Sequence, residues 1–396
     1  MRRIFGLVPN VFFLGLVSLF NDFSSEMVYS VMPAFLTVVL GAPPVFVGFI
    51  EGFADALASF LKIFAGWFSD RIGKRKILSV IGYSLSTATR YALSLVANFW
   101  HVFALRAIDR VGKGFRDSPR DALISESVER SEVGRSFGYH RAMDTIGGAL
   151  GPLAAVILLP LLAYNYRLLF FMGFLFGILA VLAFVFVRDI PRDPEKPLRK
   201  IPFTFSLKEF SASFKFYILA VFLFGLGFLP LGLVLLQSPI IGLEAISIPV
   251  MYFIYSLSFV IFAIPFGRLS DKIGEEKVLM LGFLFAIIGY SALIFFNNPI
   301  GVFFSFIIFG VYSAMTDGVE RALASKLVMS EQLASGQGFL NAAVGISSLL
   351  AGLIGGSLWT FFGPAPAFIY SIVTMSIGLL FFLLYNKRYG LGKTKI

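Results

Sequence analysis

Cysteine is absent from this 396-residue sequence, and histidine occurs only at His101 and His140. Without cysteine the chain forms neither a disulfide nor a thiolate metal site, and two histidines do not make a histidine-rich one. Charge is also scarce, because Asp, Glu, Lys and Arg together make up 14% of the residues. That share is far below the one typical of soluble domains. We therefore expect no metal, no other cofactor and no soluble enzyme domain.

Apolar sequence fills most of the chain. The hydrophobic fraction is 58% and the mean hydropathy is +0.86. Apolar runs of about 20 residues, enough for a helix to cross a ~30 Å hydrocarbon layer, recur until twelve fit. They are continuous, whereas a β-barrel needs short alternating segments. The sequence thus predicts an all-α membrane protein with spans at 9–37, 44–68, 77–97, 101–121, 136–162, 167–187, 214–238, 247–268, 277–297, 300–322, 335–360 and 365–386.

The net charge of +10 is spread over connections between spans. It does not form a basic patch with interleaved aromatics, so we expect no nucleic-acid partner. Alternate connections hold nearly all the basic residues, and the positive-inside rule places these in the cytoplasm. Both termini are then predicted to be cytoplasmic, in a multi-pass protein of the cell membrane.

A polar, proline-containing segment near the middle of the chain divides the spans into two sets of six. We predict a first half at 1–187, a cytoplasmic linker at 188–213 and a second half at 214–396. GWFSDRIGKRK, starting at Gly66, is echoed by GRLSDKIGEEK, starting at Gly267. A weaker echo also falls at a separation of about 200 residues. The simplest account is two homologous halves related by a pseudo-two-fold axis.

GWFSDRIGKRK resembles the signature loop of the major facilitator superfamily, G-x-x-x-D-R-x-G-R-R. Gly66, Asp70, Arg71 and Gly73 match it, and the degenerate second copy keeps Asp271. In physical terms, Asp70 and Arg71 lie at a helix end, where they can pair with neighbouring helices in one state only. We predict that these five residues form a conformational latch, whereas the adjacent lysines serve as topology signals.

Two further stretches are similar to motifs of that family. In the span at 101–121, Arg106 and Gly112 match R-x-x-Q-G-x-G, but Asp109 and Arg110 replace the usual Gln and Gly. The span at 136–162 is similar to the antiporter motif G-x8-G-x3-G-P-x-x-G-G, although its closing glycine pair is missing. The residues that match there are Gly138, Gly147, Gly151 and Pro152. Their small size favours close helix packing, with a hinge as the alternative.

The resemblance implies a secondary transporter that alternates between inward-open and outward-open states and holds a small molecule between its halves. It resembles the proton-coupled drug and metabolite efflux branch most, and it implies a chain that works as a monomer. Uptake of a small organic anion is the alternative. A lipid-handling protein or an intramembrane enzyme is a more distant alternative. The enzyme is disfavoured because no nucleophile stands in register with a base.

The predicted span at 101–121 contains an unusual run, RAIDRVGKGFRDSPRD. Its ionisable residues recur at helical spacing, so they form one stripe along one face. An unpaired charge at the bilayer centre costs roughly 2.5–3.5 kcal/mol on insertion scales. The stripe must therefore face water or opposite charge, while the members from Arg116 onward are expected to extend to the cytoplasmic surface.

Acidic and basic residues elsewhere in the first half supply partners for this stripe. A buried carboxylate beside other acids can take up a proton on one side and release it when a basic group approaches. The alternative is permanent ion pairing that only holds the bundle together. Candidates for proton coupling or ion pairing are Asp22, Glu26, Glu51, Asp55, Asp109 and Asp144; candidates for substrate binding or charge pairing are Arg90, Arg106, Arg110, Lys113 and Arg141.

Overall fold

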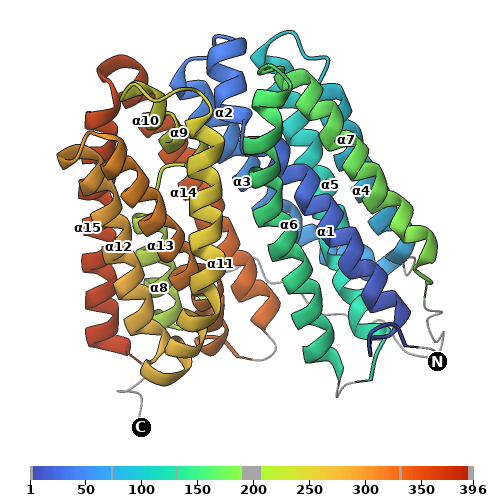
Figure 1. Ribbon diagram of the computed structural model, residues 1–396. Coiled ribbons are helices and arrows are strands. Elements are labelled where there is room, and N and C mark those ends of the chain that lie inside the picture. Colours follow the sequence, from blue (N-terminus) through green and yellow to red (C-terminus); the bar gives the residue numbers. More distant parts are fainter. Residues whose placement is uncertain (1–2, 73–74, 130–131, 190–206, 330–331, 391–396) are drawn as a thin grey trace. The chain divides into compact units, whose positions relative to one another are not determined.

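The computed structural model describes residues 3–72, 75–129, 132–189, 207–329 and 332–390, without the side chains of 62–72, Ser118 and Ala334. Every regular element in these ranges is helical, as the sequence predicts (Figure 1). The chain forms two compact units: residues 1–40 with 60–200, called unit 1 here, and residues 41–59 with 201–396, called unit 2. Helix α3, Pro44–Ile72, is divided between them.

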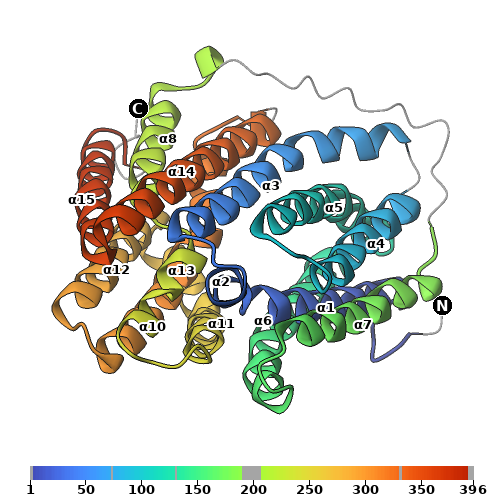
Figure 2. The same cartoon turned by 90° about the horizontal axis from the view of Figure 1, so that it is seen from above.

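Unit 1 is built around the helix that starts the chain. Helix α1 packs against α6 and α7, while α4 packs against α5 and α7 (Figure 2). Its apolar core includes Val11, Leu14 and Val17 of α1 and Tyr83 of α4. The elements are α1 Pro9–Tyr29, α2 Met32–Ala34, the π-helical turn η1 Phe35–Val39, α4 Arg75–Leu93, α5 Phe99–Glu126, α6 Val133–Leu161, α7 Tyr166–Ala183 and the 3-10 turn η3 Phe184–Phe186.

Unit 2 repeats this pattern. Helix α8 packs against α14 and α15, while α12 packs against α13 and α15. Stacked Phe224 and Phe283, with ring centroids 3.7 Å apart, join α8 to α12. The elements are the 3-10 turn η4 Leu207–Glu209, α8 Ala212–Gly225, α9 Leu231–Leu235, α10 Gln237–Ile240, α11 Ser247–Ile273, α12 Glu275–Phe295, α13 Pro299–Lys326, α14 Leu333–Phe362 and α15 Pro364–Tyr389.

The repeat extends to details of capping. Helices α5 and α13 begin and end 200 residues apart. The Asn98 side chain caps α5 by accepting from the His101 amide at 3.1 Å, and the Asn298 side chain caps α13 by accepting from the Gly301 amide at 2.9 Å. Such caps satisfy main-chain donors that have no partner inside the helix. The same local chemistry therefore starts the corresponding helix in each unit.

Each predicted span coincides with a helix or with a broken helical segment. Among the described residues, nine segments are long and apolar enough to cross a membrane. Helices α4 and α5 are not among them, and the range 214–238 is divided into the short helices α8, α9 and α10. Helix α1 also stops at Tyr29, before α2. Pro33 at the start of α2 and Pro230 before α9 lie next to these breaks, because proline starts a helix readily and does not continue one.

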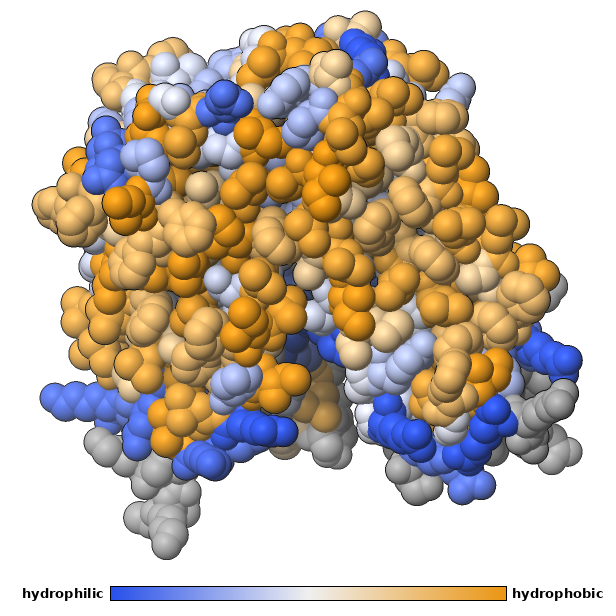
Figure 3. All heavy atoms as spheres, viewed as in Figure 1, coloured by the Kyte–Doolittle hydropathy of each residue, from blue (hydrophilic) through white to orange (hydrophobic). Residues whose placement is uncertain are grey.

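Large apolar side chains cover the outside of the helices. On α6, Ile146, Leu150, Ile157 and Leu161 are exposed at spacings that place them on one face. In Figure 3, hydrophobic atoms dominate the surface of the helices in each unit, whereas hydrophilic side chains gather toward their ends. Exposed apolar helix faces of this length are expected to contact lipid.

Glycines bring α6 into direct contact with α1. A Cβ atom at Gly147 would collide with the main-chain oxygen of Leu19, and one at Gly151 would collide with that of Phe23. By contrast, no atom of the described residues lies within 4 Å of a Cβ added at Gly138 or Gly148. Of the predicted packing glycines, Gly147 and Gly151 therefore pack against α1, and Gly138 does not. Pro152 is buried inside α6.

We expect Gly147→Ala to lower the stability of the protein, because α1 must move away from α6. Overpacking of this kind costs about 1–3 kcal/mol. Gly148→Ala, one residue further along the same helix, meets open space and should leave stability unchanged. Thermal unfolding of both purified variants in detergent tests this contrast. Equal unfolding midpoints would show that α1 and α6 do not depend on their close approach.

An ion pair occurs at the same place in both units, but with its charges exchanged. Arg75 at the start of α4 lies 2.9 Å from Glu126 at the end of α5. Glu275 at the start of α12 lies 2.5 Å from Lys326 at the end of α13. Helix dipoles favour an acid at a helix start and a base at a helix end. The pair in unit 2 follows this preference, and the pair in unit 1 opposes it.

Glu126→Arg should therefore lower stability by about 1 kcal/mol by placing two cations together. Adding Arg75→Glu should recover that loss, because it restores the pair in the orientation that the helix dipoles favour. Unfolding of the single and double variants, measured side by side, checks the expectation. If the double variant is no more stable than the single one, the two side chains are not coupled.

Candidate functional site

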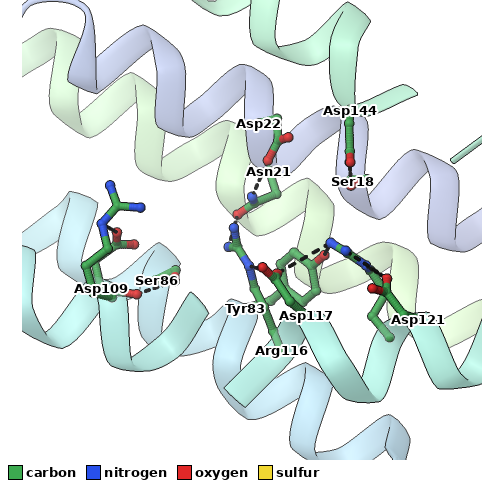
Figure 4. Close-up of polar contacts among 12 residues, drawn as sticks. Ser18, Asn21, Asp22, Tyr83, Ser86, Asp109, Arg116, Asp117, Asp121 and Asp144 are labelled. Carbon is green, nitrogen blue, oxygen red and sulfur yellow. Dashed lines mark hydrogen bonds and ion pairs between the residues drawn. The ribbon is translucent and has the colours of Figure 1, made fainter. Parts of the chain in front are cut away.

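A cluster of charged and polar side chains fills the interior of unit 1 between α1, α4, α5 and α6 (Figure 4). Helix α5 contributes most of it. None of its eight ionisable residues from Arg106 to Asp121 is exposed, whereas Ala104 and Ile108 on another face of the helix are. The stripe predicted from the sequence is thus turned inward, as the cost of placing charge in lipid requires.

Asn21 of α1 joins the parts of this cluster. Its side-chain oxygen accepts hydrogen bonds from Arg90 and from Arg116, each at 2.9 Å. Its amide nitrogen donates to the Asp22 carboxylate at 2.8 Å. Asn21 is only 1% exposed. One neutral side chain therefore links two guanidinium groups on two helices to one carboxylate.

Arg90 of α4 is completely buried, yet its hydrogen bonds go to neutral groups. Besides Asn21, it donates to the Ser24 hydroxyl of α1 at 3.0 Å. Its Nε finds no hydrogen-bond acceptor among the described residues. A guanidinium group has five N–H donors, so these contacts leave donors unused. Asp109 and Tyr29 act on Arg90 electrostatically without bonding to it.

Tyr29, near the end of α1, lies beside two arginines of α5. The guanidinium carbon of Arg106 lies 3.9 Å from the centre of the Tyr29 ring, and that of Arg110 lies 5.6 Å from it. Asp109 approaches Arg110 at 3.8 Å. Within the described chain, the buried Tyr29 hydroxyl and the Arg110 Nε have no hydrogen-bond partner. Cation–π contact explains how the ring sits against the arginines, but it leaves the hydroxyl unused.

Further along α5, a second group of charges surrounds Tyr83. Arg116 lies over the Tyr83 ring at 4.6 Å, and Arg120 donates to its hydroxyl at 3.2 Å. Arg116 also contacts Asp117, and Arg120 contacts Asp121 at 2.9 Å. The expectation that Arg116 extends to the surface is wrong. It is 5% exposed because Asn21 and Tyr83 offer it an acceptor and a ring inside the unit.

Asp144 of α6 lies in the part of the cluster next to Ser18 of α1. It accepts a hydrogen bond from Ser18 of α1. His140 and Arg141 approach it at 3.7 and 4.0 Å, which are long distances for ion pairs. Arg141 is mostly exposed. Asp144 therefore connects α6 to α1, and Arg141 lies outside the buried cluster.

The other predicted acids fall elsewhere. Glu51 and Asp55 belong to the part of α3 assigned to unit 2, where Asp55 accepts from Ser348 at 3.0 Å. Glu26 is half-buried on α1. Lys113 makes no hydrogen bond with the described residues but acts electrostatically on Asp22. Of the predicted acids, the cluster thus contains Asp22, Asp109 and Asp144, but neither Glu51 nor Asp55.

The predicted latch is mostly outside the described residues. Gly66, Asp70 and Arg71 lie on the helical main chain of α3, but their side chains are not described, and Gly73 is not described at all. Asp271 is exposed near the end of α11. The latch therefore stays a prediction.

The sequence reasoning missed the neutral members of the cluster, Asn21, Ser24, Tyr29 and Tyr83. A signal existed in the case of Asn21, which directly precedes Asp22 in a predicted membrane span. Ser24 follows Asn21 by three residues, which places both on one face of α1. Tyrosines in an aromatic-rich chain carry no comparable signal.

Comparison with known proteins identifies relatives along the whole chain. A family model described as Major Facilitator Superfamily matches residues 14–252 and 231–395. An uncharacterized MFS-type transporter from Methanocaldococcus jannaschii is 32% identical over 381 residues, covering 94% of each chain. A multidrug resistance protein, MdtH, from Cronobacter sakazakii is 25% identical over 327 residues, covering 81% of this chain and 79% of that one.

Solved structures share the fold. A peptide transporter of the POT type superposes with a TM-score of 0.79 at 15% identity, covering 97% of this chain and 95% of the other. The nucleoside transporter NupG superposes with a TM-score of 0.78 at 15% identity, covering 96% and 99%. At this level of identity the likeness concerns the fold alone.

Asn21→Leu should destabilise the protein by about 2–4 kcal/mol, because it leaves two buried guanidinium groups without their shared acceptor. Asn10→Leu is the matched control on the same helix. Asn10 is also buried, at 9% exposed, and bonds to Ser127 and to the Arg188 main chain, so its loss leaves mainly neutral groups without a partner. Chemical unfolding in detergent should show the larger loss for Asn21. Equal losses would mean that Asn21 does not hold the arginines.

Proposed function

Since the chain belongs to the major facilitator superfamily, we propose that it is a secondary transporter that exports a small molecule in exchange for protons by alternating access. Membership in the family makes the chain a membrane transporter. Export is supported by the similarity to a protein named for multidrug resistance. The inward-facing charges of unit 1 support proton coupling. We further propose a monomer in the cell membrane with both termini in the cytoplasm.

The bonding of Asp22 is the observation that carries proton coupling. Its hydrogen bond within the described chain comes from neutral Asn21, and no arginine pairs with it directly. A carboxylate locked to an arginine would stay ionised, whereas one held by a neutral amide can change its protonation state at lower cost. Asp22 is half-buried, and we propose that a proton reaches it from its exposed side.

The proposed cycle uses Asn21 to connect Asp22 with Arg90 and Arg116. With Asp22 ionised, its negative charge is balanced through the amide by the two guanidinium groups. Protonation of Asp22 removes that balance and strengthens the net positive charge around Arg90 and Arg116. A shift of α1 relative to α4 and α5 can then accompany the change of access. On the other side of the membrane, the approach of a cationic side chain makes Asp22 release its proton.

Asp109 has a different part in this scheme. It lies among Arg90, Arg106, Arg110 and Arg116, all of which act on it electrostatically. Surrounded by cations, a carboxylate retains its negative charge. We propose that Asp109 is the fixed counter-charge of the cluster and that Asp22 is the group that titrates.

Asp22→Asn should abolish proton movement linked to transport, because the side chain keeps its shape but no longer binds a proton. The assay measures the internal pH of proteoliposomes under an imposed proton gradient while lipophilic cations and small organic acids are added in turn. Asp317→Asn is the matched control, since Asp317 is paired with Arg321 at 3.0 Å on α13 of unit 2.

Control and original protein should show the same substrate-dependent proton flux. Transport that continues in the original protein without any proton movement would refute the proposal. In that case the buried acids only hold the bundle together.

Uptake of a small organic anion is the second candidate function, and complete burial of Arg90 among neutral partners supports an anionic cargo. Both directions use the same cluster. The orientation of the imposed gradient that drives accumulation of the substrate distinguishes them.

A further inference from the structure

One region of the cluster carries a positive charge that the described residues leave without a direct partner. Arg90 and Arg110 each bear one positive charge, and Asp109 bears one negative charge. Asp109 approaches Arg110, while the hydrogen bonds of Arg90 go to Asn21 and Ser24. Both arginines are at most 12% exposed. A buried cation of this kind is costly unless an opposite charge joins it.

Unused hydrogen-bonding atoms occur in the same region. Among the described residues, Arg90 Nε, Arg110 Nε and the Tyr29 hydroxyl are buried without a hydrogen-bond partner. Buried polar atoms are almost always bonded, so the presence of such atoms here needs an explanation. Arg90 and Arg110 both act on Tyr29 electrostatically, and the Tyr29 ring lies 5.6 Å from the Arg110 guanidinium carbon.

All three groups can donate a hydrogen bond, and two of them are cationic. The ligand chemistry that satisfies such a set is an oxyanion, because carboxylate and phosphate oxygens accept several N–H and O–H bonds at once. A cationic ligand would be repelled by Arg90 and Arg110, whose two positive charges outnumber the one negative charge of Asp109. Water would satisfy the donors but would give Arg90 no direct counter-ion.

We infer that Arg90, Arg110 and Tyr29 bind the anionic group of the transported molecule, a carboxylate or a phosphate-like group. This inference rests on the proposed transport function in one respect, namely that the ligand is the cargo. Arg90 supplies a positive charge that is in no direct ion pair with the described residues, Arg110 supplies a second guanidinium group, and the Tyr29 hydroxyl supplies a neutral donor. Arg106 positions Tyr29 by packing against its ring at 3.9 Å.

The position of Arg90 also links binding of the cargo to binding of a proton. Arg90 bonds to Asn21, which bonds to Asp22. An anion that draws Arg90 toward itself weakens the hold of Arg90 on Asn21 and thereby changes the surroundings of Asp22. Anion binding and proton binding thus meet at one amide, which is the coupling that a proton-driven carrier needs.

The test is direct binding to the purified full-length protein in lipid nanodiscs, measured by titration calorimetry. Benzoate presents a carboxylate, phenylphosphonate presents a phosphate-like group, and tetraphenylphosphonium presents a cation of similar apolar character. We expect at least one of the two anions to bind and the cation to bind more weakly.

Tyr29→Phe is the decisive variant, because it removes only the hydroxyl and keeps the ring beside Arg106. Anion binding should weaken about tenfold or more, since a hydrogen bond to a charged group is lost. Thermal stability without ligand should be equal to or higher than that of the original protein, because a buried unbonded hydroxyl is removed. Arg90→Gln should weaken anion binding further. If this variant does not fold, Tyr29→Phe still tests the anion site.

Tyr385→Phe is the matched control. The Tyr385 hydroxyl is likewise buried without a hydrogen-bond partner in the described chain, but it lies on α15 in unit 2. Its removal should leave anion binding unchanged.

Two results would overturn the inference: stronger binding of tetraphenylphosphonium than of either anion, or anion binding that is the same in Tyr29→Phe and in the original protein. Neither result bears on the proton-flux assay of Asp22→Asn. Failure of the anion site and failure of proton-coupled export are therefore distinguished.

Discussion

The cost of placing charge in a low-dielectric membrane interior determines the structure of unit 1. Eight ionisable residues on α5 cannot face lipid, so α5 turns them toward α1 and α4. Those helices must in turn provide polar surfaces, and α1 does so with Asn21 and Ser24, which accept hydrogen bonds from Arg90. The glycines of α6 let α1 pack closely on its other side. The polar interior and the apolar exterior of the unit thus follow from one constraint.

Hydrophobic length and charge spacing made much of the fold predictable. Continuous apolar runs predicted helices at all twelve ranges, and helical spacing predicted that the charges of α5 share a face. The breaks at Tyr29 and Gly225 were not predicted, because their prolines lie inside ranges of uninterrupted hydropathy. Division of α3 between the two units also escaped prediction, since it depends on tertiary packing of small residues such as Gly48 and Gly52 against α14.

The site was predicted less completely, and for a physical reason. Sequence patterns reveal charged residues in apolar spans because they are rare and costly there. They do not reveal which neutral side chain will accept a hydrogen bond from an arginine. Arg90 and Arg116 were expected to pair with acids or to reach the surface, yet both bond to Asn21. An amide carries no charge, so it gives no comparable signal in a sequence pattern. Its oxygen can nevertheless accept hydrogen bonds from two donors while its nitrogen donates one.

A neutral link between Asp22 and the arginines has a consequence that a direct ion pair would not have. A buried carboxylate bonded to a guanidinium group is held ionised, and separating the two costs several kcal/mol. An ion pair of that strength would favour a single state of the carrier. Through Asn21 the attraction is weakened by distance and shared between two arginines, so the proton binding and release that we propose for Asp22 need not break a strong bond. The amide keeps Asp22 and Arg90 dependent on each other while leaving each free to change partner. A carrier that must reach two states of similar free energy requires that balance.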